Sequence, residues 1–302
     1  MKRMISLFMA MLRSLGVLRS ASYPVRAKIR LAVTYLRMTC KLVVLDPFLH
    51  LKHEKFLGYQ VNCGSYRLLH MLFAEIFMLE EYFFQSESPA PYIMDCGANI
   101  GLATVYFKWR YPQARVCAFE PNANAFELLA KNISQNRLDN VTLWNAALSG
   151  HEGEVLFYPD KLDSAGVSGS IHPNRLAGQP TVVRAVRLSR FLDSGEIDFV
   201  KMDIEGAEQK VVSEVSRSGR LCDVKQLEIE YHHRIAGEES NISYLLSELE
   251  SSGFDYQICA SLPPGRNGPQ DIMVYACRSR RAVVNKPIAL AESLQKSLST
   301  SM

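Results

Sequence analysis

The 302-residue sequence predicts an α/β fold in which a mostly parallel sheet carries helices on both faces. Short apolar runs, too short for helices, alternate along the chain with longer segments of helical periodicity. The run that starts at residue 92 and ends at Asp95 is followed by a turn with two glycines and then by a helical segment, an order typical of parallel sheets. The runs at residues 256–260 and 271–277 have no helical segment between them, which predicts an antiparallel last strand.

The turn after this strand predicts the ligand. Asp95 ends the strand, Gly97 and Gly101 follow it, and a helix is expected from Leu102. Glycines have no Cβ, so the backbone can approach a nucleotide-like ligand closely. The middle glycine of the dinucleotide fingerprint is missing, and the carboxylate of Asp95 would repel a pyrophosphate. The turn therefore favours a ligand with an amino-acid tail and a nucleoside but no phosphate, such as S-adenosylmethionine.

A second acidic residue agrees with this ligand. The next strand is expected at residues 114–119, and Glu120 ends it, about 20 residues beyond the glycine turn. A carboxylate there can accept hydrogen bonds from both ribose hydroxyls, each worth on the order of 1.5–3 kcal/mol. It would repel a 2′-phosphate, which argues against NADP.

These residues, with two later blocks, resemble the FkbM family of S-adenosylmethionine-dependent methyltransferases. The blocks follow the family's order: Asp-Cys-Gly-Ala-Asn-Ile-Gly at 95–101, Phe-Glu-Pro-Asn at 119–122, Asn-Ala-Ala-Leu-Ser at 145–149 and Lys-Met-Asp-Ile-Glu-Gly-Ala-Glu at 201–208. The last block is the most specific, and the resemblance covers roughly Phe56 to Cys277. It implies a Rossmann-like class I methyltransferase fold with a mostly parallel seven-stranded sheet and an antiparallel last strand. It also implies methyl transfer to a hydroxyl of a small molecule or glycan.

The resemblance suggests a role for each candidate site residue. The methionine part of the cofactor is expected to contact four residues: Asp95, Gly97, Asn99 and Gly101. Glu120 is expected to bind the ribose and Asn145 the adenine. Asp203, Glu205 and His232 are expected to face the acceptor, with His232 as the general base.

Three carboxylates within residues 203–208 would destabilise the fold if they had no functional role, because like charges repel and raise one another's pKa. The cofactor's sulfonium, the substrate hydroxyl and Lys201 would offset them. The alternative is that Glu205 caps a helix and Glu208 is solvated. Some O-methyltransferases hold Mg²⁺ on clustered carboxylates, but the sequence gives no independent sign of an ion, so no metal is assigned.

Charge separates the chain into three expected parts. Residues 1–55 form a basic, partly helical extension, residues 56–280 the methyltransferase-like domain, and residues 281–302 a polar tail. Residues 1–60 carry eleven Lys or Arg against Asp46 and Glu54, about +9 in all, which leaves the remainder at about −6 for a total of +3. The acidic domain argues against a nucleic-acid substrate.

The first 20 residues are apolar with basic flanks. They could pack as a helix on the domain or on another subunit, or lie on a membrane surface, while a signal peptide fits less well because no cleavage site is evident. The seven cysteines are odd in number and form no C-x-x-C pair, which predicts reduced thiols in a cytoplasmic protein. The apolar and basic residues 1–20 add the expectation of a peripheral membrane contact.

Several other segments carry expectations. Residues 68–84 are expected to form a helix in which Glu75 and Tyr82 could touch the cofactor, although core packing is the simpler interpretation. Residues 153–158 and 181–188 are expected to form a hairpin or inserted edge strands. The Ser- and Gly-rich loop between them could close over the acceptor or be a plain insertion, and His172 is expected at the surface.

Two other functional classes remain open. The domain could bind the cofactor without transferring a methyl group and act through its basic N-terminus at a membrane or acidic partner. It could also be a nucleotide-dependent oxidoreductase, against which the missing middle glycine speaks. The retention of Asp95, Glu120 and Asp203 together favours the enzyme.

Overall fold

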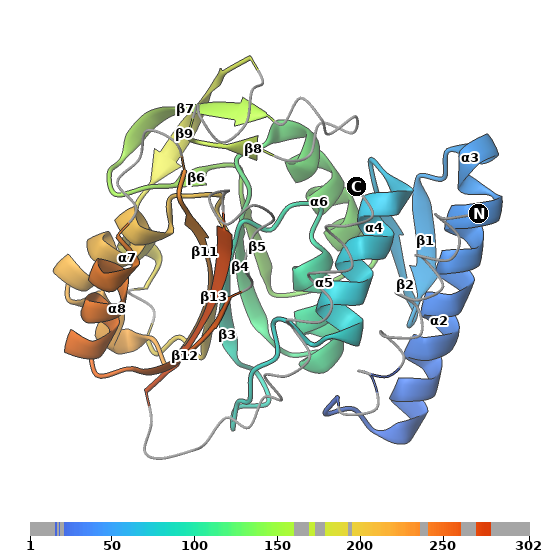
Figure 1. Ribbon diagram of the computed structural model, residues 1–302, viewed down its shortest axis with the longest axis horizontal. Coiled ribbons are helices and arrows are strands. Elements are labelled where there is room, and N and C mark those ends of the chain that lie inside the picture. Colours follow the sequence, from blue (N-terminus) through green and yellow to red (C-terminus); the bar gives the residue numbers. More distant parts are fainter. Residues whose placement is uncertain are drawn as a thin grey trace.

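The computed structural model describes residues 21–159, 169–172, 179–192, 195–235, 241–260 and 270–278, together with Gly16 and Leu18. The described elements form layers. Helices α7 and α8 lie on one side of a central sheet, helices α4, α5 and α6 lie on the other, and a small hairpin with helix α2 packs outside them (Figure 1).

The central sheet has seven strands in the order β12-β13-β11-β10-β3-β4-β5. The strands are β3 (Tyr92–Cys96), β4 (Arg115–Phe119), β5 (Val141–Trp144), β10 (Phe199–Met202), β11 (Gln226–His233), β12 (Asp255–Ala260) and β13 (Gln270–Cys277). All pairs from β11 to β5 are parallel, whereas β13 runs antiparallel to both of its neighbours. The predicted α/β fold is confirmed, and the sheet is mixed because its last strand is reversed.

The apolar runs form strands because helices cover both faces of the sheet. Ile93, Met94 and Cys96 of β3 are each fully buried, and successive strand side chains point to opposite faces. One core lies beneath α5 (Leu102–Arg110) and α6 (Ala123–Gln135). The other lies beneath α7 (Glu208–Arg217) and α8 (Ile242–Ser251).

Helix α6 begins where the sequence suggests a cap. The Oδ1 atom of Asn122 accepts hydrogen bonds from the backbone nitrogens of Asn124 and Ala125, at 3.0 and 3.4 Å. These bonds satisfy two donors that have no partner inside the helix. The cap fixes the start of α6 directly after Glu120.

A second, smaller sheet lies beyond the carboxyl ends of the central strands (Figure 1). It consists of β6 (Ala147–Leu148), β7 (Gly153–Pro159), β8 (Gly169–Ser170) and β9 (Thr181–Val186). The antiparallel pairing of β7 with β9 confirms the pair expected from residues 153–158 and 181–188. The predicted loop between them lies largely outside the described residues.

The described end of that loop is anchored on the turn after β10. Ser170 donates from Oγ to the carbonyl oxygen of Glu205 at 2.5 Å, and Nε2 of His172 lies 3.0 Å from the carbonyl oxygen of Gly206. His172 is buried, so the expectation of a surface histidine is wrong. The sequence does not show this long-range contact between residues more than 30 positions apart.

The N-terminal part shares the core of the rest. It comprises α2 (Val25–Val44), α3 (Asp46–Leu49), β1 (His53–Phe56), β2 (Tyr59–Asn62), α4 (Tyr66–Phe73) and the π-helical turn Ala74–Met78. Leu31, Tyr35 and Met38 of α2 are at most 3% exposed and belong to the same core cluster as Phe73 of α4. The boundary at residue 55 therefore crosses a packed core.

The helix expected over residues 68–84 ends early. After α4 the chain widens into the π-helical turn, and Glu80 then adopts a positive φ of 54°. The Glu80 carboxylate accepts hydrogen bonds from the backbone nitrogen and hydroxyl of Ser22 and lies 3.7 Å from Arg110. Contacts far along the chain therefore outweigh the local helical pattern at this point.

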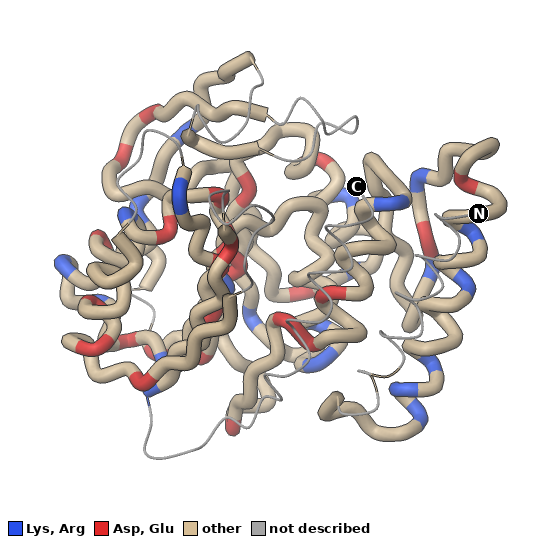
Figure 2. The backbone as a smooth tube through the Cα atoms, in the orientation of Figure 1, with Lys and Arg blue, Asp and Glu red and all other residues tan. Residues whose placement is uncertain are grey.

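The outer face of α2 carries apolar side chains that are exposed to solvent. Val25, Ile29 and Val33 are 71%, 58% and 60% exposed and lie on one side of the helix. The helix has five Lys or Arg residues and no acidic one, and the basic positions follow its length in Figure 2. Among the described residues, no helix combines the length and the hydropathy needed to span a bilayer.

Candidate active site

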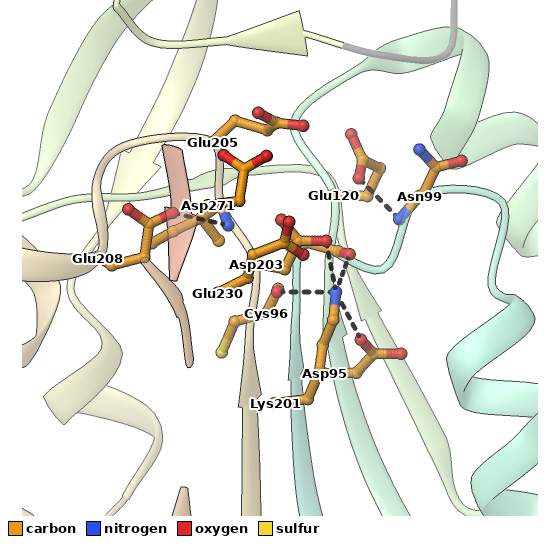
Figure 3. A network of polar contacts seen from close by, with 12 residues as sticks. Asp95, Cys96, Asn99, Glu120, Lys201, Asp203, Glu205, Glu208, Glu230 and Asp271 are labelled. Atoms are coloured by element: carbon orange, nitrogen blue, oxygen red, sulfur yellow. Dashed lines mark hydrogen bonds and ion pairs between the residues drawn. The ribbon is translucent and has the colours of Figure 1, made fainter. Parts of the chain in front are cut away.

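The carboxyl ends of four parallel strands converge at one edge of the central sheet. Cys96 of β3 lies opposite Phe119 of β4 and Met202 of β10, and Met202 lies opposite Ile229 of β11. The residues that follow these positions therefore meet at the same edge, where α/β sheets bind ligands. Figure 3 shows the polar side chains that gather there.

Gly97 and Gly101 shape the turn after β3. Both have positive φ, 83° and 86°. A Cβ on Gly97 would lie 1.8 Å from the carbonyl oxygen of Asp203, and one on Gly101 would lie 2.6 Å from Cδ1 of Leu129. The turn thus touches the turn after β10 and helix α6, and glycine is required at both positions.

Glu120 follows β4 and faces the glycine turn. Its two carboxylate oxygens accept hydrogen bonds from the backbone nitrogens of Asn99 and Asn122, each at 2.8 Å. Burial raises the pKa of Glu120 to about 7, although the two backbone donors favour the carboxylate. Each oxygen keeps a lone pair with which it can accept a further bond from a ligand hydroxyl.

Lys201 of β10 links the turns after β3 and β10. Its Nζ donates to the carbonyl oxygens of Gly97 and Cys96, at 2.6 and 3.3 Å. The same atom lies 3.7 Å from Oδ2 of Asp203 and 3.8 Å from Oδ1 of Asp95. Burial opposes the charge, but Asp203 and Asp95 raise the pKa of Lys201 above its ordinary value. The site therefore contains a permanent buried cation.

Asp95 lies beneath the turn and does not line the cleft. It is fully buried, and its Oδ2 accepts a hydrogen bond from Oγ1 of Thr104 at 2.6 Å. Burial raises the pKa of Asp95, while Lys201 lowers it. Its contacts join β3, β10 and α5 directly under Gly97.

Asn145 lies behind the loop that carries Glu120. Its Nδ2 donates to the carbonyl oxygens of Glu120 and Pro121, at 2.8 and 3.2 Å. The amide nitrogen is therefore engaged in holding this loop, and the side-chain oxygen is the atom left for a ligand contact.

His232 of β11 is the centre of an acidic cluster. Its Nδ1 lies 2.8 Å from Oε1 of Glu208, and both side chains are at most 2% exposed. Its Nε2 faces four further carboxylate oxygens: Glu205 Oε2 at 3.4 Å, and Asp203 Oδ1, Glu230 Oε1 and Asp271 Oδ1 at 3.9 Å each. Burial opposes the charged imidazolium, but Glu208 and the other carboxylates raise the pKa of His232 to about 10.

Sequence reasoning misses part of this cluster. Glu208 is 1% exposed, so the alternative that it is solvated is wrong, and Glu230 and Asp271 are not among the predicted residues. Glu230 has a signal in the sequence, because a charged residue inside a buried strand needs a partner. Asp271 has none, since it meets His232 only through the pairing of β11 with β13.

One open cleft joins the glycine turn to the acidic cluster. Gly97, Asn99 and Glu120 line one side, and Asp203 and Glu205 line the other. Phe157, Gly169 and Ile171 of the smaller sheet and its surroundings complete the wall.

Comparison with known proteins gives a family. The family model described as the Methyltransferase FkbM domain matches residues 95–256. The chain is 31% identical over 175 residues to Methyltransferase sdnD of Sordaria araneosa, an alignment that covers 48% of this chain and 68% of that protein.

Two further relatives have more specific names. The 2-O-methyltransferase NoeI of Sinorhizobium fredii is 30% identical over 143 residues, which cover 42% of this chain and 58% of NoeI. The hexuronic acid methyltransferase AglP of Haloferax volcanii is 28% identical over 163 residues, which cover 53% of this chain and 63% of AglP. The chain thus matches less than two thirds of the length of NoeI and AglP.

Proposed function

Because the chain belongs to the FkbM methyltransferase family, we propose that it moves a methyl group from S-adenosylmethionine to a hydroxyl group of a small molecule or glycan. The observation that carries this proposal is the single cleft in which Gly97 and Glu120 lie across from Asp203 and Glu205. The names of NoeI and AglP, which state 2-O-methyl transfer and a hexuronic acid substrate, support a hydroxyl on a sugar-like acceptor. We interpret the mixed sheet as the Rossmann-like sheet of class I methyltransferases.

The residues on one side of the cleft fit the cofactor. Gly97 and Gly101 keep the backbone open where a Cβ would fill the turn, so the methionine part of the cofactor can lie against Gly97 and Asn99. Glu120 would accept hydrogen bonds from the ribose, and the amide oxygen of Asn145, which makes no hydrogen bond with the described residues, would accept one from the adenine amino group. Asp95 would act from below, through Lys201, which binds the carbonyl of Gly97.

Bound there, S-adenosylmethionine would supply an electrophilic methyl group on a sulfonium. Asp203 and Glu205 lie at the other side of the cleft, partly exposed, and would orient the acceptor hydroxyl toward that methyl group. The hydroxyl oxygen would form the new bond to the methyl carbon as the carbon–sulfur bond breaks and S-adenosylhomocysteine leaves, and the hydroxyl proton would pass to a carboxylate of the cluster. His232 fits the role of base poorly, because its carboxylate neighbours favour the protonated imidazole.

Calorimetry on the full chain tests the cofactor assignment. Wild type is expected to bind S-adenosylmethionine, and Glu120→Ala to bind it roughly tenfold more weakly or worse, the effect of one or two charged hydrogen bonds. Glu127→Ala removes an exposed carboxylate from α6 and serves as the matched control. Wild type that binds NADH, or that binds neither S-adenosylmethionine nor S-adenosylhomocysteine, would overturn the proposal.

Detection of the product tests the transfer itself. Incubation with a panel of monosaccharides and uronic acids is expected to give a methyl ether, seen as the mass of one added CH₂. If the cofactor binds but no hydroxyl compound is methylated, the alternative of a non-catalytic cofactor-binding module gains support.

The outer face of α2 favours a place at a lipid surface. The predicted contact through residues 1–20 lies outside the described residues except for Gly16 and Leu18, and stays a prediction. The exposed stripe that contains Ile29 and Val33 has basic neighbours at Arg26 and Arg30 and no acidic residue along the whole helix. This combination suits the surface of an anionic bilayer, and we propose that α2 lies on one.

A further inference from the structure

We propose that Asp203, Glu205 and Nε2 of His232 bind one divalent metal ion of the oxygen-preferring class, such as Mn²⁺ or Mg²⁺. The binding site itself does not depend on the proposed methyl transfer; only the use of the ion rests on that function. The three residues come from the turn after β10 and from β11. Asp203 and Glu205 line the cleft and lie close together in Figure 3, and Nε2 of His232 lies 3.9 and 3.4 Å from their carboxylate oxygens.

The spacing of the ligand atoms fits one ion. One ligand atom from each residue lies within 4.8 Å of the others, with Nε2 3.4 Å from Glu205 Oε2 and 3.9 Å from Asp203 Oδ1. Ligands held about 2.1 Å from a common ion lie roughly 3.0 Å apart at right angles and roughly 4.2 Å apart when opposite. The two separations from Nε2 fall between these limits and the third is below 4.8 Å, so shifts smaller than about 1 Å would complete the coordination.

Glu208 orients the histidine as metal sites require. Its Oε1 lies 2.8 Å from Nδ1 of His232 and also accepts hydrogen bonds from the backbone nitrogens of Ile204 and Gly206, at 3.2 and 2.9 Å. A carboxylate fixed in this way holds a proton on Nδ1 and directs the lone pair of Nε2 into the cluster. Histidines that bind metals are typically oriented by such a second partner.

The Nε2 atom is the second, independent sign of a ligand. His232 is 2% exposed, and among the described residues its Nε2 makes no hydrogen bond; its neighbours are four carboxylate oxygens at 3.4–3.9 Å. A lone pair aimed at carboxylates is repelled unless a cation lies between them. A proton on Nε2 offsets this repulsion when no ion is bound, and a divalent cation that contacts Nε2 and the carboxylate oxygens together would displace that proton.

The chemistry of the ligands selects the ion. Carboxylate oxygens suit Mg²⁺, Mn²⁺ and Ca²⁺, and one imidazole among them favours Mn²⁺ within this group. Glu230, His232 and Asp271 form a second possible group, but both groups use His232, so one ion is expected. Glu230 and Asp271 would then hold the ion's water ligands.

If the methyl transfer is as proposed, the ion would bind the acceptor hydroxyl and lower its pKa. As the oxygen attacks the methyl carbon, the carbon–sulfur bond would break and release S-adenosylhomocysteine, and the hydroxyl proton would pass to a carboxylate of the acidic cluster that does not bind the ion. His232 would then be a ligand instead of the base expected from the sequence.

Metal binding is measured on the full chain after removal of ions with EDTA and dialysis, without cofactor. Titration with Mn²⁺, followed by calorimetry and by the electron paramagnetic resonance signal of the free ion, is expected to give one site per chain. Asp203→Asn and Glu205→Gln are expected to weaken binding at least tenfold. Glu196→Gln neutralises an exposed carboxylate before the first residue of β10, at the end of the strand away from the site, and should bind Mn²⁺ as wild type does.

Two controls keep the result specific. Thermal unfolding of each variant shows whether it folds, so a loss of Mn²⁺ binding in a variant that unfolds as wild type does belongs to the site. S-adenosylmethionine binding by the same EDTA-treated protein separates the metal site from the proposed function. The metal site would be overturned, even if the cofactor binds, by either of two results. One is that wild type does not bind Mn²⁺, and the other is that Asp203→Asn and Glu205→Gln bind Mn²⁺ as tightly as wild type does.

Discussion

Gly97 carries two separate requirements, and substitution can tell them apart. Its φ of 83° disfavours any other residue, and a Cβ would also overlap the carbonyl of Asp203 at 1.8 Å. Gly253 has nearly the same φ, 80°, but no atom within 4 Å of the added Cβ. Gly253→Ala is expected to cost about 1–2 kcal/mol of unfolding free energy, the cost of the backbone conformation alone.

Gly97→Ala is expected to cost clearly more than Gly253→Ala and to weaken cofactor binding, because the turn must move away from Asp203. Chemical denaturation and calorimetry measure both effects. Equal costs for the two variants would mean that the contact between the turns after β3 and β10 adapts to an added methyl group.

The raised pKa of Glu120 predicts a pH dependence of cofactor binding. The ribose requires the carboxylate, so affinity should rise as the pH increases through about 7 and level off above it, changing by up to about tenfold per pH unit on the acidic side. The contribution of Glu120 to the free energy of unfolding changes with pH in the opposite direction. Because its pKa is raised in the folded state, this contribution is fully present below the pKa of the unfolded chain and is lost as the pH rises through about 7. Glu120→Gln should bind weakly without this pH dependence in calorimetry between about pH 6 and about pH 8.

Individual residues show what the sequence can predict about the site. Gly97, Asn99, Glu120, Asp203 and Glu205 all line the cleft, because a motif at the end of a parallel strand fixes where its residues lie. The environment of His232 could not be predicted in the same way. Asp271 reaches it through strand pairing, and the orientation of Glu208 depends on the turn that Gly206 makes.

At the scale of elements, α2 makes the membrane proposal testable. The double variant Ile29→Ser/Val33→Ser reduces the apolar stripe, while Leu156→Ser/Val182→Ser alters an exposed apolar pair on β7 and β9 and serves as the control. In sedimentation with vesicles, wild type and the control are expected to bind phosphatidylserine-containing membranes more than pure phosphatidylcholine. The stripe variant should bind less, and salt should weaken all binding.

Equal binding by the stripe and control variants would contradict the membrane role of α2. Light scattering distinguishes the other occupant of this face. A wild-type dimer that becomes a monomer in the stripe variant would show that α2 contacts a second copy of the chain.

The strands and helices differ in how well the sequence predicts them. The strands of the central sheet follow from apolar runs between turns, since burial on both faces leaves little freedom in composition. The helix expected over residues 68–84 fails at Glu80, whose carboxylate is held by Ser22 and Arg110. Local periodicity contains no information on such partners.

For the whole molecule, the shared core of α2 and α4 predicts how the chain responds to truncation. Removal of residues 1–55 exposes the core that Leu31, Tyr35 and Met38 cover, at about 1.5–3 kcal/mol for each large side chain. The loss is comparable to the total stability of a typical domain, about 5–15 kcal/mol. The truncated chain is expected to lose its cooperative thermal transition, whereas removal of residues 281–302 should leave the transition midpoint unchanged.

A cooperative transition with an unchanged midpoint after removal of residues 1–55 would instead support an independent domain over residues 56–280. Circular dichroism at increasing temperature measures both truncations. In that case the contacts of Leu31 and its neighbours would contribute little to stability.

The place of β13 in the sheet also decides when the protein can mature during synthesis. Among the described strands β13 is translated last, yet it lies between β11 and β12 and pairs with both. Until residues 270–277 leave the ribosome, two strand edges stay open to pairing with other chains, and His232 lacks Asp271 beside it. A message cut short before this point would therefore yield a chain that is prone to aggregate and has an incomplete acidic cluster.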